Sequence, residues 1–260
     1  MVNLNITPPW LTIVSVHKDD SNGLSRTLAS VRIQDLIGVE HTIIDSSRNP
    51  VTESDLDRIA PKLHKVDLEW SEPRGVYAAM NLGIQGARGK YTLFLNAGDV
   101  FHSGSVVSSL RQSVYLFDPL WLYGRVNLVD ASGEHRPQKS FNYSREYARK
   151  FRSGRFPQQP GMLVRTDLLR DLGGFNEIYR IASDYEFMLR LSQVAEPMRV
   201  EFVITDFKTG GLSTTNWRKS LMEACRARET VYELGPAGRI AERFRSIRVY
   251  VRAFGYRLFR

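Results

Sequence analysis

Short apolar runs alternate with helical patterns along the first part of the chain. Residues 11–16 are mostly β-branched and apolar, which favours a buried strand, and they end in the polar cluster 17–23. Residues 24–31 carry apolar positions at helical spacing, and residues 40–45 form a second strand pattern that runs into the polar stretch 46–50. Strand, helix, strand predicts the start of a parallel, doubly wound α/β sheet. Ligands bind such sheets at the carboxyl ends of the strands, where both polar clusters are expected.

The alternation continues to about residue 204. A helix is predicted over 77–87, and Gly86 and Gly89 are suited to ending it. Residues 91–95 predict a third buried strand, while the Arg-rich, Pro-punctuated stretch 134–160 is expected to be a flexible loop. Further strands are predicted at 121–126, 161–164 and 200–204, and further helices at 166–172 and 183–193.

The end of the chain carries a different pattern. Its apolar residues recur at steps of 4, 3, 4, 3 and 4, which predicts an amphipathic helix. Two interpretations are open: the stripe packs on the rest of the chain or on a second subunit, or the helix lies in a membrane surface with its arginines on anionic lipid. The stripe consists of Ile240, Phe244, Ile247, Val251, Phe254 and Leu258.

Charge is concentrated in the same segment. Residues 238–260 contain seven arginines and one acid, so they carry 7 − 1 = +6 of the total +8 and leave 8 − 6 = +2 for the rest. A near-neutral body argues against nucleic-acid binding by the fold, and the apolar stripe argues against it in the tail.

One cysteine among 260 residues excludes an internal disulfide. No signal peptide and no apolar run of about 18 residues is recognised, so a cytoplasmic protein is expected, peripheral on the membrane at most.

Two carboxylates are candidates for chemistry. Asp99 follows the strand at 91–95 behind the small pair Ala97 and Gly98, where Mg²⁺ or Mn²⁺ can meet a carboxylate and phosphate oxygens. The alternative is a plain turn, because all residues from 96 to 99 suit one. Asp184 opens the helix at 183–193, where an acid serves as a general base or simply as a partner of the helix dipole. Glu186 is expected to face away.

An ordered set of motifs resembles one family. The chain is similar to bacterial family 2 inverting glycosyltransferases of the polysaccharide and glycolipid branch, over about residues 10–235. The resemblance implies a GT-A-type fold, Rossmann-like, doubly wound and mainly parallel. The matching segments are 12–20 (TIVSVHKDD), 44–47, 71–83 (SEPRGVYAAMNLG), 94–99 (FLNAGD), 161–162, 172–175 (LGGF), 183–190 and 210–213.

The resemblance assigns roles to individual residues. Asp99 takes the place of the metal-binding acid of the DXD element, and Asp184 the place of the catalytic base. Departures are Asn96 and Ser183, which stand where the family has the first acid of each pair, and Arg74, which lies near the position of another acid. The donor-binding residues implied are Val16, His17, Asp19, Asp45, Arg74, Met80, Asn81, Asn96, Ala97, Gly98 and Ser213.

The resemblance also implies a reaction and its partners. A nucleoside-diphosphate sugar is attacked by a hydroxyl of a lipid-linked or oligosaccharide acceptor in one displacement, with Mn²⁺ or Mg²⁺ on the leaving diphosphate. A domain over 1–215 is expected, with a nucleotide-binding half at about 1–100 and an acceptor half at 101–215, followed by a helical extension over 216–260; a homo-oligomer is compatible with this. Because two acids are missing, a non-catalytic nucleotide-sugar-binding or scaffold protein is the alternative.

Overall fold

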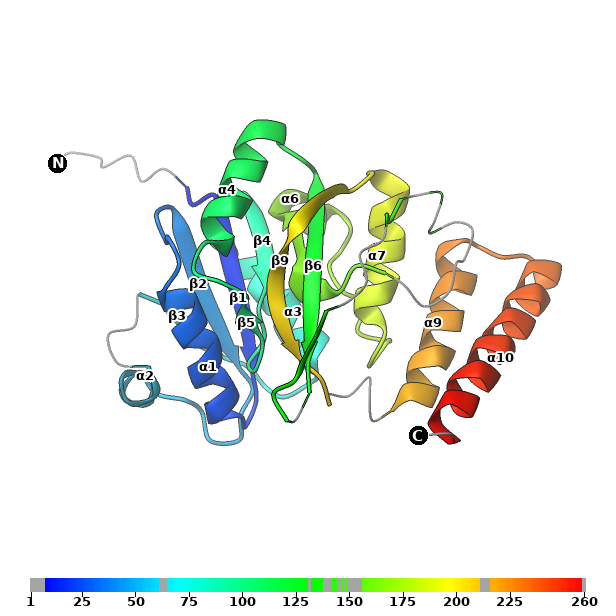
Figure 1. The fold of residues 1–260 in the computed structure, drawn as a ribbon, viewed down its shortest axis with the longest axis horizontal. Coiled ribbons are helices and arrows are strands. Elements are labelled where there is room, and N and C mark those ends of the chain that lie inside the picture. The colour runs from blue at the N-terminus through cyan, green and yellow to red at the C-terminus, as the bar shows by residue number, and fades with distance from the viewer. Residues whose placement is uncertain are drawn as a thin grey trace.

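A mixed nine-stranded sheet forms the centre of the molecule (Figure 1). The computed structural model describes residues 8–60, 65–130, 132–137, 142–144, 146, 148, 156–210 and 216–258. The strand order is β3-β2-β1-β4-β8-β6-β9-β5, and β7 pairs with β6 outside this path. The α/β architecture expected from the sequence is thereby confirmed.

The N-terminal strands are parallel. β1 (Leu11–His17) lies between β2 (Val39–Asp45) and β4 (Tyr91–Phe94), and β3 (Asp67–Trp70) extends the sheet beyond β2. The helices that return the chain between these strands are α1 (Ser21–Arg32), α2 (Glu53–Ile59) and α3 (Val76–Gly86). Since the strands run the same way, their carboxyl ends and the polar segments after them meet at one edge of the sheet.

The rest of the sheet mixes directions. β8 is antiparallel to both β4 and β6, β9 is parallel to β6, and β5 and β7 pair antiparallel with β9 and β6. The elements are β5 (Val100–Phe101), α4 (Val106–Phe117), β6 (Trp121–Val129), β7 (His135–Pro137), a 3₁₀ helix η1 (Gln159–Gly161), β8 (Met162–Arg165), α6 (Thr166–Asp171), α7 (Ser183–Val194) and β9 (Met198–Lys208). β7 and η1 fall within the predicted loop 134–160, which is therefore not irregular throughout; much of it lies outside the described residues.

Alternate residues of β1 point to opposite faces of the sheet and belong to two hydrophobic cores. Leu11 and Ile13 point to one face of the sheet, where they join the apolar side of α4, while Val14 and Val16 point to the other, where α3 and α7 pack. All four are at least nine-tenths buried. This period of two is what a strand covered by helices on both faces requires.

Two helices extend the molecule at the end remote from α1 and α2 (Figure 1). α9 (Trp217–Val231) packs against α7, and α10 (Pro236–Leu258) packs against α9. The stripe residues Ile240, Phe244 and Ile247 of α10 are 57%, 65% and 56% exposed, whereas the inward-facing Glu242 is 1% exposed. The interpretation in which the stripe packs on the rest of the same chain is therefore wrong for these three residues, and the buried residue of this part of α10 is the charged Glu242. The side chains of Val251, Phe254 and Leu258 lie outside those that the structure describes.

Packing of α3 on β1 depends on a missing side chain. A Cβ at Gly83 would stand 2.4 Å from Cγ1 of the fully buried Val14, whereas a Cβ at Gly86 of the same helix would meet nothing within 4 Å. We expect Gly83→Ala to lower the free energy of unfolding by about 1–3 kcal/mol through overpacking. Gly86→Ala, the matched control, should leave it unchanged or raise it by up to about 1 kcal/mol through helix propensity. Urea unfolding of both variants measures the difference, and equal stabilities would contradict this account of the contact.

Candidate functional site

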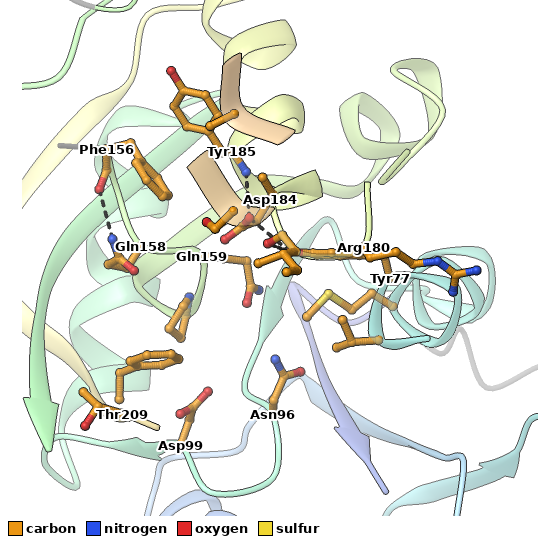
Figure 2. A pocket seen from close by; sticks show the side chains of 18 of the residues that line it. Tyr77, Asn96, Asp99, Phe156, Gln158, Gln159, Arg180, Asp184, Tyr185 and Thr209 are labelled. Atoms are coloured by element: carbon orange, nitrogen blue, oxygen red, sulfur yellow. Dashed lines mark hydrogen bonds between the residues drawn. The ribbon is translucent and has the colours of Figure 1, made fainter. Parts of the chain in front are cut away.

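A cavity of about 640 Å³ opens at the carboxyl ends of β1 and β4 and is walled on its far side by α7 and α9. Asn96, Asp99 and Asp184 all line it. Figure 2 shows Asn96 and Asp99 on one side of the cavity and Asp184 with Tyr77 and Tyr185 on the other. The structure thus brings together the two carboxylates that the sequence singled out separately.

The turn that carries Asn96 and Asp99 is fixed by neighbouring elements. Beyond the end of β4 the chain still follows β1, since Leu95 N donates to Val14 O at 2.9 Å and Ala97 N to Val16 O at 3.0 Å. The buried hydroxyl of Thr27 on α1 then accepts from Gly98 N at 3.0 Å and donates to Asp99 O at 2.8 Å. Gly98 has φ +102°, which a residue with a side chain rarely adopts.

Asp99 is a buried carboxylate that receives few hydrogen bonds from the rest of the protein. It is 4% exposed, and its Oδ1 accepts one hydrogen bond, from Lys208 N at 3.2 Å. Burial raises the pKa of Asp99 to about 7, against the opposing effects of the Lys208 amide and charge. A bound cation would favour the charged form, so the electrostatics of this residue fit a metal ligand.

Asn96 supports the same interpretation. Its Oδ1 is buried and has no hydrogen-bond partner. A buried acceptor without a partner is uncommon and costs about 1–3 kcal/mol. Asn96 and Asp99 both line the cavity, and each could offer one oxygen to a metal ion; no cluster of three or more His, Cys, Asp or Glu suited to a metal occurs among the described residues. Mg²⁺ or Mn²⁺ bound here would need phosphate oxygens and water to complete its shell.

Asp184 lies in the first turn of α7, where its carboxylate is held on one oxygen. Oδ1 accepts from Tyr185 N at 2.8 Å and from the Tyr77 hydroxyl at 3.1 Å. Burial raises the pKa of Asp184 above its usual range, and these two hydrogen bonds lower it again in part. Glu186 faces away as expected, since it is 4% exposed and pairs with Arg190 at 2.8 Å. Of the two acids, Asp184 alone faces the cavity.

The backbone around Asp184 is held by α9. Glu223 Oε2 accepts from Ile181 N at 2.8 Å and from Ala182 N at 3.0 Å, directly before α7 begins. On the other side of Asp184, the Arg228 guanidinium donates to the Tyr185 hydroxyl at 2.9 Å and is paired with Glu242 of α10 at 2.6 Å. The two C-terminal helices therefore belong to the wall of the site.

Three of the other predicted donor residues are buried and do not line the cavity. His17 and Asp45 are each 1% exposed and stand 4.0 Å apart, and burial lowers the pKa of His17. Asp45 accepts from Ser47 N at 2.9 Å and Val51 N at 2.6 Å, so it shapes the loop after β2. Val16 is 9% exposed and pairs with β2 and the 96–99 turn.

Of the remaining predicted donor-binding residues, some line the cavity and others do not. Met80 and Ala97 line the cavity, as does Asp20 rather than the predicted Asp19, whose Oδ1 accepts from Arg48 N at 3.2 Å. Asn81 instead bonds the backbone of Phe175 through both ends of its amide, at 2.8 and 2.9 Å. Gly98 supports the metal turn, the side chain of Arg74 is exposed outside the cavity lining, and Ser213 lies outside the described residues.

Several cavity residues have no clear signal in the sequence. Lys208 ends β9 with its Nζ 3.9 Å from Asp20 Oδ2, and Arg180, Gln159 and Arg228 also line the cavity. These residues come from four segments far apart in the chain. Only the tertiary fold brings them together, although the polar residues that end the strand pattern at 200–204 point to Lys208.

A known protein family and two relatives resemble this chain in sequence. The sequence model of the family described as Glycosyl transferase family 2 matches residues 12–186. Uncharacterized glycosyltransferases from two strains of Mycobacterium tuberculosis are each 32% identical to this chain over 214 residues, which is 79% of this chain and 78% of each relative.

Solved structures share the fold at low sequence identity. Residues 1–349 of Staphylococcus aureus TarS in complex with UDP align with a TM-score of 0.63 at 14% identity, covering 88% of this chain and 68% of that one. The mannosyltransferase PcManGT of Pyrobaculum calidifontis, in complex with GDP-Man and Mn²⁺, aligns with a TM-score of 0.61 at 16% identity, covering 88% and 66%. The family match and the two mycobacterial relatives together show that this chain belongs to glycosyl transferase family 2.

Proposed function

We propose that this chain is an inverting glycosyltransferase that moves a sugar from a nucleoside-diphosphate donor to a hydroxyl of a polysaccharide or glycolipid acceptor. One observation carries the proposal: Asn96 and Asp99 line one side of the cavity, and Asp184 lines the other (Figure 2). A single displacement needs a leaving-group site and a base on opposite faces of the transferred sugar. We place the nucleotide-binding half over about residues 1–100 and the acceptor half over 101–215.

On the leaving-group side, Asp99 and Asn96 would hold Mn²⁺ or Mg²⁺, which supplies positive charge for the departing diphosphate. The unpartnered Oδ1 of Asn96 and the raised pKa of Asp99 fit such an ion. The solved complexes of similar fold contain UDP, UDP-GlcNAc, or GDP-Man with Mn²⁺, which supports a donor of this class. With one carboxylate present, we expect the ion to bind together with the donor.

On the acceptor side, Asp184 would take the proton from the attacking hydroxyl. A general base works best when its pKa lies near the working pH, and burial moves the pKa of Asp184 in that direction. The hydrogen bonds from Tyr185 N and Tyr77 keep Oδ1 in place. Ser183 stands where the family has the first acid of this pair. Its side chain is fully buried, and its hydroxyl donates to Asn176 O at 2.9 Å. The replacement of that acid by serine therefore removes no carboxylate from the cavity.

The alternative is a non-catalytic protein that binds nucleotide sugars, suggested by the two missing acids. Asp184→Asn separates the two hypotheses, because it removes the proton acceptor and keeps the shape. We expect turnover of the donor to fall by about 10²- to 10⁴-fold with donor binding retained. Asp167→Asn, in the first turn of α6 and outside the cavity lining, is the control and should retain turnover. Binding without turnover in the unmodified protein would favour the alternative.

Tyr77→Phe tests how the base is tuned. The hydroxyl lies 3.1 Å from Asp184 Oδ1 and 2.7 Å from Ile181 O, and its hydrogen bond lowers the pKa of Asp184. Removing it should raise that pKa, so the acid limb of the kcat profile should move to higher pH by up to about one unit. Activity would then be lost mainly below the limb and less at alkaline pH. A limb that stays in place or moves to lower pH would contradict the role of Asp184 as base.

We also propose that the enzyme works at the cytoplasmic face of the membrane, bound through α10. Within the part of the chain that the structure describes, no helix has both the length and the apolar character to cross a bilayer. The exposed Ile240, Phe244 and Ile247 are flanked by the exposed Arg239, Arg243, Arg245 and Arg248, which complements an anionic lipid surface. Each basic residue near such a surface contributes about 1 kcal/mol.

Sedimentation with phosphatidylglycerol vesicles tests this surface. We expect the full chain to pellet with them, and Phe244→Ser with Ile247→Ser to remove most of the pelleting by deleting apolar area at constant charge. The matched control is Leu116→Ser with Phe117→Ser on α4, which are 61% and 67% exposed and should not matter. Equal pelleting of both double variants would contradict the proposal. A solution dimer that only the α10 variant dissociates would assign the stripe to a second subunit instead.

A further inference from the structure

Two glutamines of this protein are buried to the same degree and differ in their hydrogen bonding. Gln34 is 8% exposed and fully bonded: its Nε2 donates to Ser30 O at 3.0 Å and Ser103 O at 2.7 Å, and its Oε1 accepts from Val107 N at 3.2 Å. Gln159 is 9% exposed, and its Nε2 has no partner. A buried amide without a hydrogen-bond partner destabilises the folded protein. Its presence is explained if a bound ligand supplies the missing hydrogen bond.

The position of Gln159 is set by its backbone. It opens η1, where Gly161 N donates to Gln158 O at 2.9 Å and Pro160 O accepts from the Thr205 hydroxyl at 2.6 Å. A Cβ at Gly161 would stand 2.5 Å from Val126 Cγ2, so this segment lies hard against the sheet. The backbone that carries the amide is therefore fixed, and Gln159 lines the cavity from this segment.

The amide of Gln159 lies between the two halves of the proposed reaction. Figure 2 shows it in the cavity between Asp184 on one side and Asn96 and Asp99 on the other. A small void that Gln159 also lines is mainly apolar, with Phe94, Met162 and Phe175 among its residues, and it includes Thr92 and Asp184 as well. The described residues supply no partner for Nε2, so a ligand in the cavity is the partner that remains.

We infer that Gln159 recognises a hydroxyl or acetamido group of the sugar that is transferred. This inference rests on the proposed function. In that reaction the transferred sugar lies between a diphosphate at Asp99 and an acceptor hydroxyl at Asp184, and it must therefore occupy the space at Gln159. A side-chain amide both donates and accepts, which suits a sugar hydroxyl. A site built to hydrogen-bond such a group discriminates strongly against sugars that lack it, since the buried amide is then left unpaired.

Gln159→Leu separates sugar recognition from nucleotide binding. Titration calorimetry with Mn²⁺ compares each nucleotide with its sugar conjugate: UDP with UDP-GlcNAc, and GDP with GDP-mannose. For the pair that binds, we expect the Kd of the nucleotide to change less than about twofold and the Kd of the conjugate to rise about 5- to 30-fold. The same variant should raise the melting temperature of the free protein, because it removes an unpaired buried amide.

Gln34→Leu is the control. It should lower the melting temperature, because three hydrogen bonds are lost, and leave the ratio of the two Kd values unchanged. If Gln159→Leu binds the conjugate as the unmodified protein does, or lowers the melting temperature as Gln34→Leu does, the inference about Gln159 is wrong while the proposed function stands. If the unmodified protein binds no nucleotide and no conjugate, the proposed function fails, and the inference about Gln159 with it.

Discussion

Pairing between β1 and β4 is the interaction on which the rest of the site depends. It continues past the end of β4 through Leu95 and Ala97, so the turn with Asn96 and Asp99 starts from a position set by backbone hydrogen bonds. Thr27 of α1 then locks that turn from the opposite side. Because β4 also pairs with β8, the same strand fixes the segment from which Gln159 reaches the cavity. One strand therefore sets the position of the 96–99 turn relative to Gln159.

The cavity is built from groups that the free protein leaves poorly satisfied. Asp99 is buried with one weak hydrogen bond, and Asn96 and Gln159 each bury a polar atom without a partner. Elsewhere the same residue types are bonded, as Gln34 and Asn81 are. Such local violations concentrate at functional sites, where a ligand supplies what the protein omits. The unfavourable free energy of these groups is offset by the two cores on either face of the sheet.

The sequence predicted most of the frame, and it singled out Asp99 and Asp184, which both line the cavity. Strands such as β1 and β4 are short apolar runs that end in polar clusters, and their period and punctuation suffice to place them. α4 was missed because its apolar positions are broken by serines, and β3 because it is largely exposed; α9 falls within the helical extension predicted over 216–260. In the site, Asp99 and Asp184 follow recognisable motifs. Lys208, Gln159 and Arg228 do not, since their positions depend on how β9, η1 and α9 meet in space.

The stripe on α10 shows a further limit of pattern reading. Periodicity identified the helix and its apolar face correctly, but it did not indicate which face would lie inward. Glu242 lies inward and pairs with Arg228, while the described stripe residues face outward. The partner of Glu242 stands on another helix, which a one-dimensional pattern does not contain.

The Arg228–Glu242 pair also bears on how the chain can be shortened. A protein cut before α10 loses Glu242 and leaves the guanidinium beside Tyr185 and the cavity without its counter-charge. Such a fragment would be altered in the cavity wall at Tyr185 and Arg228 as well as at its outer surface. Activity lost on trimming would therefore report two effects at once, and the last helix is better regarded as a part of the enzyme than as a detachable anchor.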